Sequence, residues 1–180
     1  MSKSKLRKKV LKIRKVSNLR NYKIDFKKIL NLVKKSEHRI KSIGGYFPVN
    51  HEIDDLEILK NFSKKNYKIC LPVIKKNFDM NFYQWSFNEP LKINKYGIPE
   101  PNPKKLIYPD VMLVPLVAFD KNLNRLGYGG GFYDRLIKKI NNKKRIVKIG
   151  LAFSNQKINT VPVNKHDKKL DYIVTEKYIL

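Results

Sequence analysis

The chain has 180 residues, 42% of them hydrophobic and 11% aromatic, which predicts one globular domain over residues 1–180 and excludes a disordered chain. Its 40 lysines and arginines against 15 acidic residues give a net charge of +25, which calls for anionic partners, although their spread along the whole chain favours a solvated surface over a nucleic-acid site. No apolar run approaches the roughly 20 residues that span a bilayer, and no secretory segment follows the basic start, so we expect a cytoplasmic protein without membrane contact.

The N-terminal part predicts two helices. Residues 3–15 place Leu6, Val10 and Ile13 on one helical face and lysines and arginines around the rest, which indicates a short basic amphipathic helix. The apolar pattern of residues 26–33 predicts a second helix. Taken alone, the basic side chains of the first helix read as a solvated surface.

An extended segment at residues 40–47 precedes an acidic stretch at residues 50–56. We expect these acidic residues to form the opening turn of a helix that runs to about Phe62, because carboxylates there favour the helix dipole. Glu52 is therefore either a helix-start carboxylate or a binding residue. None of the three histidines has a partner at metal-ligand spacing, so no zinc site is predicted.

The middle of the chain predicts two strands and a loop. Residues 68–74 read as a strand broken by Pro72, with Cys70 as a small buried hydrophobic residue, and residues 80–85 read as a second strand. Five prolines between residues 90 and 109 predict a long loop without regular structure. Long loops inside compact domains tend to be functional.

Half of the chain's eight glycines lie together, at positions 127, 129, 130 and 131. The apolar run at residues 111–114 comes before them, and a helical pattern from Tyr133 to Ile140 follows, which predicts the order strand, glycine loop, helix. Glycine allows positive φ and close approach to the backbone, so the loop can turn several N–H groups towards an anion at the start of the helix.

The flanks of the glycine loop carry charge. Arg125 and Arg135 add positive charge, and Asp134 offers a hard oxygen ligand, which together fit a nucleotide phosphate with its magnesium ion. The common nucleotide signatures are absent: no G-x-x-x-x-G-K-[ST] occurs, and a dinucleotide fingerprint begun at Gly127 meets Phe132 where its third glycine belongs. A tight turn without a ligand is the alternative.

The remaining residues complete a sheet. Residues 145–153 and 172–174 read as strands, and the loop at residues 162–167 carries Asp167, whose carboxylate could face the glycine loop. Strands that alternate with helices predict a three-layer α/β/α domain with a mainly parallel sheet, whose ligands bind beyond the carboxyl ends of the strands.

Five stretches in this order resemble the 5-formyltetrahydrofolate cyclo-ligase family, also called methenyltetrahydrofolate synthetases. The most specific is residues 115–135, PLVAFDKNLNRLGYGGGFYDR. The others are Lys3 with Leu6-Arg7, Glu52 after Tyr46-Phe47-Pro48, Ile98-Pro99-Glu100-Pro101, and the segment from Pro162 to Asp171 that contains His166-Asp167. The resemblance covers nearly the whole chain.

The resemblance implies a reaction, with ATP as co-substrate and Mg²⁺ as cofactor. Members of the family convert 5-formyltetrahydrofolate to 5,10-methenyltetrahydrofolate and release ADP and phosphate. Phosphorylation of the formyl oxygen would make the carbon electrophilic and the oxygen a good leaving group, after which N10 closes the ring. Catalysis then depends on positioning and on neutralising the moving phosphoryl group, so no general acid or base is assigned.

The resemblance also implies a set of site residues. For ATP they are Lys3, Arg7, Arg125, Leu126, Gly127, Tyr128, Gly129, Gly130, Gly131, Phe132 and Tyr133. For the folate they are Arg7, Phe47, Glu52, Tyr128, Gly129, Gly130, Gly131 and Phe132, with Tyr96 as a further aromatic contact. For Mg²⁺ they are Asp134 and Asp167, which could otherwise be a helix-start carboxylate and a turn residue.

Two other functions stay open at this stage. A paralogue could keep the ATP loop and use another substrate, which loss of Lys3, Arg7 or Glu52 would have favoured; all three are present. An RNA-binding module is the second, because residues 127–130 match G-x-x-G, a weak pattern that no RNP-type aromatic run accompanies. We expect a monomer that acts on small molecules, and the positive charge suits a folate with a polyglutamate tail.

Overall fold

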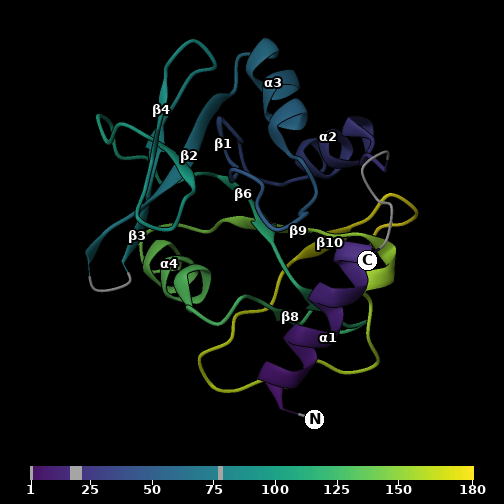
Figure 1. Ribbon diagram of the computed structural model, residues 1–180. Coiled ribbons are helices and arrows are strands. Elements are labelled where there is room, and N and C mark those ends of the chain that lie inside the picture. The colour runs from purple at the N-terminus through teal and green to yellow at the C-terminus, as the bar shows by residue number, and fades with distance from the viewer. Residues whose placement is uncertain (1, 17–21, 77–78) are drawn as a thin grey trace.

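The computed structural model describes residues 2–16, 22–76 and 79–180, and a six-stranded sheet lies at its centre (Figure 1). The strands are β1 (Ser42–Gly44), β2 (Lys68–Ile74), β3 (Met80–Gln84), β6 (Val111–Pro115), β9 (Val147–Leu151) and β10 (Tyr172–Val174). Their order is β10-β9-β6-β1-β2-β3, and every neighbouring pair is parallel except β2 with β3. The prediction of an α/β fold with a mainly parallel sheet is confirmed.

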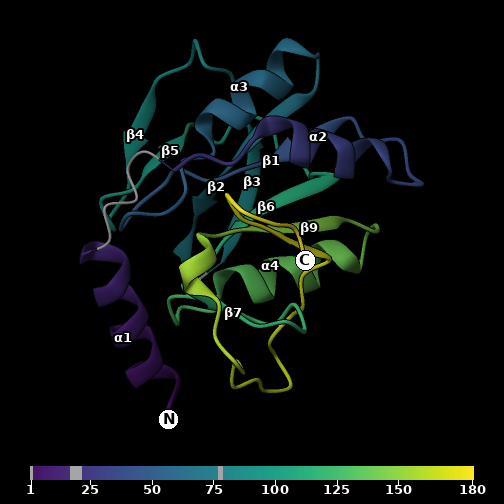
Figure 2. The ribbon, with the colours of Figure 1, turned by 90° about the vertical axis from the view of Figure 1, so that its right-hand side faces the viewer.

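Helices cover both faces of the sheet (Figure 2). The helices α2 (Phe26–Lys34) and α3 (Leu56–Lys64) lie on one face, and α4 (Phe132–Asn141) lies on the other. Val111 and Leu113 of β6 belong to the core under α2 and α3, whereas Met112 and Val114 belong to the core under α4. Successive strand residues point to opposite faces, so burial on both sides explains the continuous apolar run.

The helix α1 (Lys3–Val16) stands beside these layers and packs on a small hairpin of β7 (Ala118–Phe119) and β8 (Arg125–Leu126) (Figure 2). Leu6 and Val10 are buried in this contact. The prediction that Ile13 shares their face is wrong, because Ile13 is 42% exposed and Arg14 is buried in its place. Positions 6, 10 and 14 are four residues apart and therefore line one side of the helix.

The predicted order of strand, glycine loop and helix is incomplete, because the same hairpin lies between the strand and the loop. The strands β7 and β8 come between β6 and the glycine loop and were not predicted. Asp120 organises their turn: it accepts hydrogen bonds from the backbone of Asn122 and Asn124, and its other oxygen accepts one from the amide of Val161. The turn therefore fixes the position of β8, and with it the position at which the glycine loop begins.

Two predictions based on proline are wrong. The strand β2 continues through Pro72, which pairs with Phe82 of β3. The ladder between β1 and β2 ends at Gly44 opposite Cys70, so the missing N–H of Pro72 lies beyond that ladder.

The proline-rich stretch is also not an irregular loop, since it contains a hairpin of β4 (Leu91–Ile93) and β5 (Pro99–Pro101). Pro99 and Pro101 flank Glu100, so both missing N–H groups fall on one side of a strand in a two-stranded sheet. Proline is tolerated at such an edge, which the sequence prediction did not consider.

The helix after the acidic stretch begins later than predicted. It starts at Leu56, so Glu52 lies in the preceding turn and is not a helix-start carboxylate. Asp55, at the N-cap position, points inward and accepts a hydrogen bond from the amide of Tyr46. The acidic stretch therefore holds the segment after β1 by a hydrogen bond and also provides the N-cap residue of the helix.

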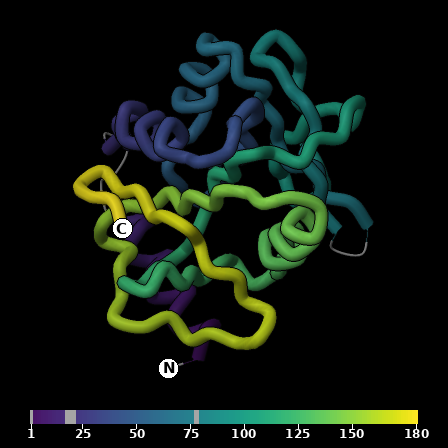
Figure 3. The backbone as a smooth tube through the Cα atoms, turned by 180° about the vertical axis from the view of Figure 1, so that it is seen from behind, coloured from purple at the N-terminus to yellow at the C-terminus, as the bar shows by residue number. Residues whose placement is uncertain are grey.

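The segment after β9 returns to the start of the chain. A 3₁₀ turn (Ser154–Gln156) follows β9, and the chain then passes below the sheet beside the N-terminal end of α1 before it enters β10 (Figure 3). An ion pair between Lys3 and Asp167 joins the two segments. Within the described residues, no helix is both long and apolar enough to cross a bilayer.

Candidate active site

A cleft of about 820 Å³ opens at the carboxyl ends of β1, β2 and β6. Phe47 follows β1, Ile74 ends β2 and Pro115 ends β6, and all three line the cleft. Because β1 continues to β2 on one side while β6 continues to β9 on the other, the cleft lies where the strand order reverses. This is the position that ligands favour in open α/β sheets.

The cleft brings together every residue that the sequence predicted for the site. The residues from the predicted set that line it are Lys3, Arg7, Phe47, Glu52, Tyr96, Arg125, Leu126, Gly127, Tyr128, Gly129, Gly130, Gly131, Phe132, Tyr133, Asp134 and Asp167. They come from α1, the segment after β1, the β4–β5 hairpin, the glycine loop with α4, and the loop before β10. The structure thus confirms their proximity, whereas their roles remain predictions.

The glycine loop leads directly into α4. Gly131 is the N-cap residue of α4 at a φ of 66°, and Gly129 has a φ of 109°, so both have backbone conformations that favour glycine. Gly129 and Gly130 are exposed in the cleft, with the Arg7 guanidinium against the first and the Phe132 ring against the second. The open loop and the adjacent helix start can present N–H groups to an anion.

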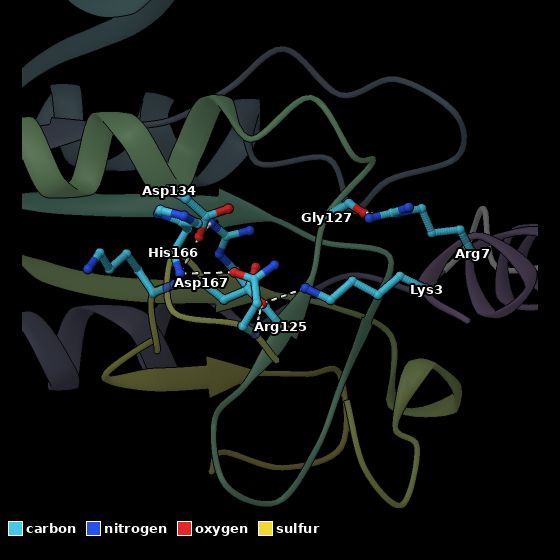
Figure 4. A network of polar contacts seen from close by, with 9 residues as sticks. Lys3, Arg7, Arg125, Gly127, Asp134, His166 and Asp167 are labelled. Atoms are coloured by element: carbon cyan, nitrogen blue, oxygen red, sulfur yellow. Dashed lines mark hydrogen bonds and ion pairs between the residues drawn. The ribbon is translucent and has the colours of Figure 1, made fainter. Parts of the chain in front are cut away.

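Two cations from α1 reach the glycine loop and its neighbour. The Arg7 Nε donates to the carbonyl oxygen of Gly127 at 2.7 Å, and its guanidinium lies against Gly129. The Lys3 ammonium pairs with the carboxylate of Asp167 (Figure 4). The lysine and arginine predicted for ATP thus both reach from α1 into the cleft.

The two carboxylates predicted for magnesium lie close together, each beside a cation (Figure 4). Asp134 Oδ1 accepts from Arg125 at 2.8 Å and from the amide of Lys168 at 2.9 Å, and the Arg125 side chain is only 4% exposed. Burial opposes ionisation of Asp167, but the hydrogen bonds from Lys3 and from the amide of Asn164 outweigh it and lower the pKa of its carboxyl.

This donor set fits a magnesium ion that is shared with phosphates. Within the described residues, no three His, Cys, Asp or Glu side chains lie close enough to hold a metal alone. Mg²⁺ usually takes one or two protein carboxylates and fills its other positions with substrate phosphates and water. Asp134 and Asp167 supply two carboxylates of that kind, next to the loop that is open to phosphate.

Glu52 is presented by a strained turn. Asn50 and His51 both have positive φ, at 51° and 61°, which is uncommon outside glycine and concentrates at functional sites. The Glu52 carboxylate accepts from the amide of Val49 at 2.8 Å, which closes the turn. Burial raises the pKa of this carboxyl, while the hydrogen bonds from Val49 and from the Tyr128 hydroxyl, together with the charge of Arg14, oppose the rise.

An apolar wall completes the cleft on the side of β2 and β3. It includes Pro72, Ile74, Met80 and Ile98, none of which the sequence reading singled out for binding. Tyr96 and Phe132 meet above it edge to face, with ring centroids 6.2 Å apart. The wall could not be found from pattern, because apolar residues at strand ends read as core.

Arg14 lies behind the cleft and contacts one of its residues, although the sequence pattern assigned it to the solvated face of the helix. It is 2% exposed, and its guanidinium donates to the carbonyl oxygen of Leu116 at 3.1 Å and to the Tyr128 hydroxyl. Its spacing of four from Val10 could have found it, since that spacing places it on the buried face of α1.

Comparisons with known proteins agree with one another. A sequence model of the 5-formyltetrahydrofolate cyclo-ligase family matches residues 1–176. A 5-formyltetrahydrofolate cyclo-ligase of Haemophilus influenzae is 35% identical over 149 residues, which is 78% of each chain, and one of Escherichia coli is 29% identical over 141 residues, 74% of this chain and 77% of that one. The NMR structure of Aquifex aeolicus 5,10-methenyltetrahydrofolate synthetase superposes with a TM-score of 0.79 at 30% identity, over 99% of this chain and 92% of the other. The synthetase of Mycoplasma pneumoniae gives 0.74 at 26% identity, over 98% and 99%.

Proposed function

The chain belongs to the 5-formyltetrahydrofolate cyclo-ligase family of enzymes, and from that premise we propose that it converts 5-formyltetrahydrofolate to 5,10-methenyltetrahydrofolate with ATP and Mg²⁺. The observation that carries the proposal is the position of the glycine loop in the cleft. One flank of the loop meets the carboxylates Asp134 and Asp167 with their cations, and Tyr128 at its centre reaches Glu52. A triphosphate and a pterin can therefore lie against one loop.

The chemistry needs the formyl oxygen to become a leaving group. In the first step this oxygen attacks the γ-phosphorus of ATP, a new P–O bond forms, the bond to the bridging β,γ-oxygen breaks, and ADP leaves. The formyl carbon then carries a phosphate and is bonded to N5 as an iminium-like centre. In the second step N10 attacks that carbon, the C–O bond breaks to release inorganic phosphate, and the departing phosphate takes the proton that N10 loses.

The residues of the cleft fit these steps through charge and position. Arg7 and the amides of the glycine loop would hold the phosphates, with Lys3 and Arg125 supplying further positive charge beside them. Asp134 and Asp167 would hold Mg²⁺, which supplies positive charge to phosphate oxygens when bound. No side chain has to take a proton in the phosphoryl transfer, so we assign no general acid or base.

The folate half depends on Glu52 and on the apolar wall. A carboxylate can accept hydrogen bonds from the amino-pyrimidine edge of a pterin, which presents several N–H donors. Phe47 lies in the same cleft and would pack on the pterin ring, next to Phe132. Burial of that ring against apolar surface would exclude water from the activated carbon.

The direct test mixes the protein, Mg²⁺, ATP and 5-formyltetrahydrofolate and follows the absorbance of the methenyl product together with ADP release. We expect one ADP for each product, and ADP release that depends on the folate. An absence of product contradicts the proposal. ATP hydrolysis that ignores the folate would point to a paralogue with another substrate, and salt-sensitive RNA binding without turnover would point to an RNA-binding module.

We further propose that residues 1–180 act in the cytoplasm as one monomeric domain. The net charge of +25 favours a folate substrate whose polyglutamate tail carries several carboxylates. A lower KM for the tailed folate than for the monoglutamate, which disappears at high salt, is the expected result. Size-exclusion chromatography with light scattering tests the monomer.

A further inference from the structure

Arg14 is a buried cation that the proposed reaction does not use. It lies on the inner face of α1, one turn beyond Val10, whereas every lysine of that helix except the half-buried Lys3 is exposed. Burial of a guanidinium is costly unless its N–H groups are hydrogen-bonded. A leucine or methionine of similar length would suit an apolar face, so the placement of an arginine here needs a reason.

The contacts of Arg14 point towards the cleft. One terminal nitrogen donates to the Leu116 carbonyl oxygen at 3.1 Å, at the end of β6, and the other donates to the Tyr128 hydroxyl in the glycine loop. The guanidinium also lies 5.7 Å from the centre of the Tyr128 ring. Arg14 therefore joins three elements: α1, the end of β6 and the glycine loop.

The contact with Tyr128 fixes the direction of its hydroxyl. Arginine has donors only, so the Tyr128 oxygen must accept from Arg14. A hydroxyl carries a single proton, and Tyr128 is left to donate it towards the Glu52 carboxylate, which lines the same cleft and whose pKa the hydroxyl helps to hold down. The order of donors is Arg14 to Tyr128 to Glu52. With the amide of Val49, this makes two donors on Glu52, and a carboxylate still has room for a ligand.

We propose that Arg14 is a positioning residue for folate: it orients the Tyr128 hydroxyl towards Glu52 and so holds the Glu52 carboxylate in place for the pterin. This rests on the proposed function. Arg14 touches neither substrate in this arrangement and acts through Tyr128. Its effect falls on the folate half of the cleft, whereas Lys3 and Arg7 of the same helix serve the phosphate half.

Arg14 is a cation near Glu52: both line a second pocket beside α1, and the charge of Arg14 lowers the pKa of the Glu52 carboxyl. Tyr128 faces it from the glycine loop, Tyr46 from the segment after β1, Asp55 from the start of α3 and Tyr133 from α4. Burial raises the pKa of each of these groups, so the three tyrosines stay neutral, and Asp55 opposes ionisation of Glu52 if it is charged. Loss of Arg14 therefore moves the pKa of Glu52 further up.

The test uses the full chain and two single variants, Arg14→Gln and Tyr128→Phe, with their double variant. Calorimetry measures the Kd for 5-formyltetrahydrofolate without ATP, and steady-state assays measure kcat and the two KM values between pH 5 and 9. We expect Arg14→Gln to raise the folate Kd about tenfold, which corresponds to about 1.4 kcal/mol. The KM for ATP should not change, and the acid limb of kcat/KM for folate should move to higher pH.

The double variant and a surface control make the test specific. If Arg14 acts through Tyr128, the double variant should bind folate no worse than the weaker single variant. Lys12→Gln removes the same charge from the exposed side of α1 and should change neither constant. Arg14→Lys keeps the charge but not the forked geometry, and should restore the pH limb more than the Kd.

Each outcome decides between specific alternatives. Additive effects of the two variants, or an unchanged folate Kd with a lower free energy of unfolding, would show that Arg14 is only structural. If Arg14→Gln does not fold, Tyr128→Phe must still weaken folate and shift the acid limb, and a failure to do so overturns the proposal. Absence of product and of folate binding in the parent is a failure of the proposed function and is seen before any variant is made.

Discussion

Substitution of Gly129 by alanine tests whether the glycine loop binds phosphate through its backbone and Arg7. Gly129 has a φ of 109°, and a Cβ added there would lie 3.3 Å from Cζ of Arg7, closer than nearly all such contacts. The guanidinium would have to move by a few tenths of an ångström. That movement strains its 2.7 Å hydrogen bond to the Gly127 carbonyl oxygen.

Gly129→Ala should have two effects, one on the free energy of unfolding through the backbone and one on ATP binding through the contact with Arg7. A residue held in a sparsely populated backbone region costs about 1–3 kcal/mol, which should reduce the free energy of unfolding. Partial loss of a hydrogen bond made by a charged group, worth about 1.5–3 kcal/mol when complete, should weaken ATP binding. If about half of that is lost, or roughly 0.75–1.5 kcal/mol, the KM for ATP rises about 3- to 12-fold.

Gly97 provides the matched control for the backbone part. It lies at the turn of the β4–β5 hairpin with a φ of 74°, and a Cβ added there meets no heavy atom within 4 Å. Gly97→Ala should therefore lose about 1–2 kcal/mol of stability and leave the KM for ATP as in the parent. Urea unfolding and ATP-dependent formation of the methenyl product measure the two effects. If Gly129→Ala loses stability like Gly97→Ala but keeps the parent KM for ATP, Arg7 and this loop do not hold the phosphates.

Three further predictions follow from the carboxylates. Asp134→Asn should raise the Mg²⁺ concentration needed for ATP binding and lower turnover about 100-fold, as loss of a metal-site group does. Glu57→Gln, at an exposed carboxylate, should change neither quantity. If the two variants behave alike, Asp134 is not part of the site. Glu52→Gln should raise the KM for folate and not that for ATP, and an unchanged folate response excludes the pterin contact. Burial raises the pKa of Asp55 well above 3.8, so the folded chain binds a proton that the unfolded chain has lost. Stability contributed by this group is present below pH 3.8 and falls as pH rises towards the folded pKa; Asp55→Asn should flatten that fall in urea titrations, and a parallel curve would contradict it.

The fold could be predicted where one physical cause dominates. The apolar run of β6 and the helical repeat of α4 each reflect burial against the sheet, and both elements lie where they were expected. Predictions that used proline as an absolute breaker were wrong at Pro72 and in the β4–β5 hairpin. Proline excludes only a backbone hydrogen bond at one position, and whether that bond is needed depends on a neighbouring strand that the local sequence does not reveal.

The candidate site could be predicted where residue type restricts the chemistry. Clustered glycines with flanking charges pointed to a loop that lines the cleft, and the structure adds that Gly129 and Gly131 have positive φ. The apolar wall could not be predicted, because Ile74 and Met80 are as apolar as any core residue and only the end of the sheet leaves them facing the cleft. The inward turn of Asp55 was also hidden, since an acidic residue before a helix is normally explained by the helix alone.

The solvent-facing position predicted for Arg14 is wrong for the same reason that the role of α1 in the cleft is hidden in the sequence. Hydrophobic pattern assigns every lysine and arginine of α1 to solvent, yet Lys3, Arg7 and Arg14 each contact a different part of the cleft: Asp167, the Gly127 carbonyl oxygen and Tyr128. Leu6, Val10 and the half-buried Leu11 make the apolar contact of this helix, and the three cations add polar contacts to it. If the proposed function holds, the same helix carries groups beside both ligands, so a shift of the helix on binding would reach both halves of the cleft. Occupation of one half of the cleft should therefore change the affinity of the other half, through α1 and to the same extent in both directions.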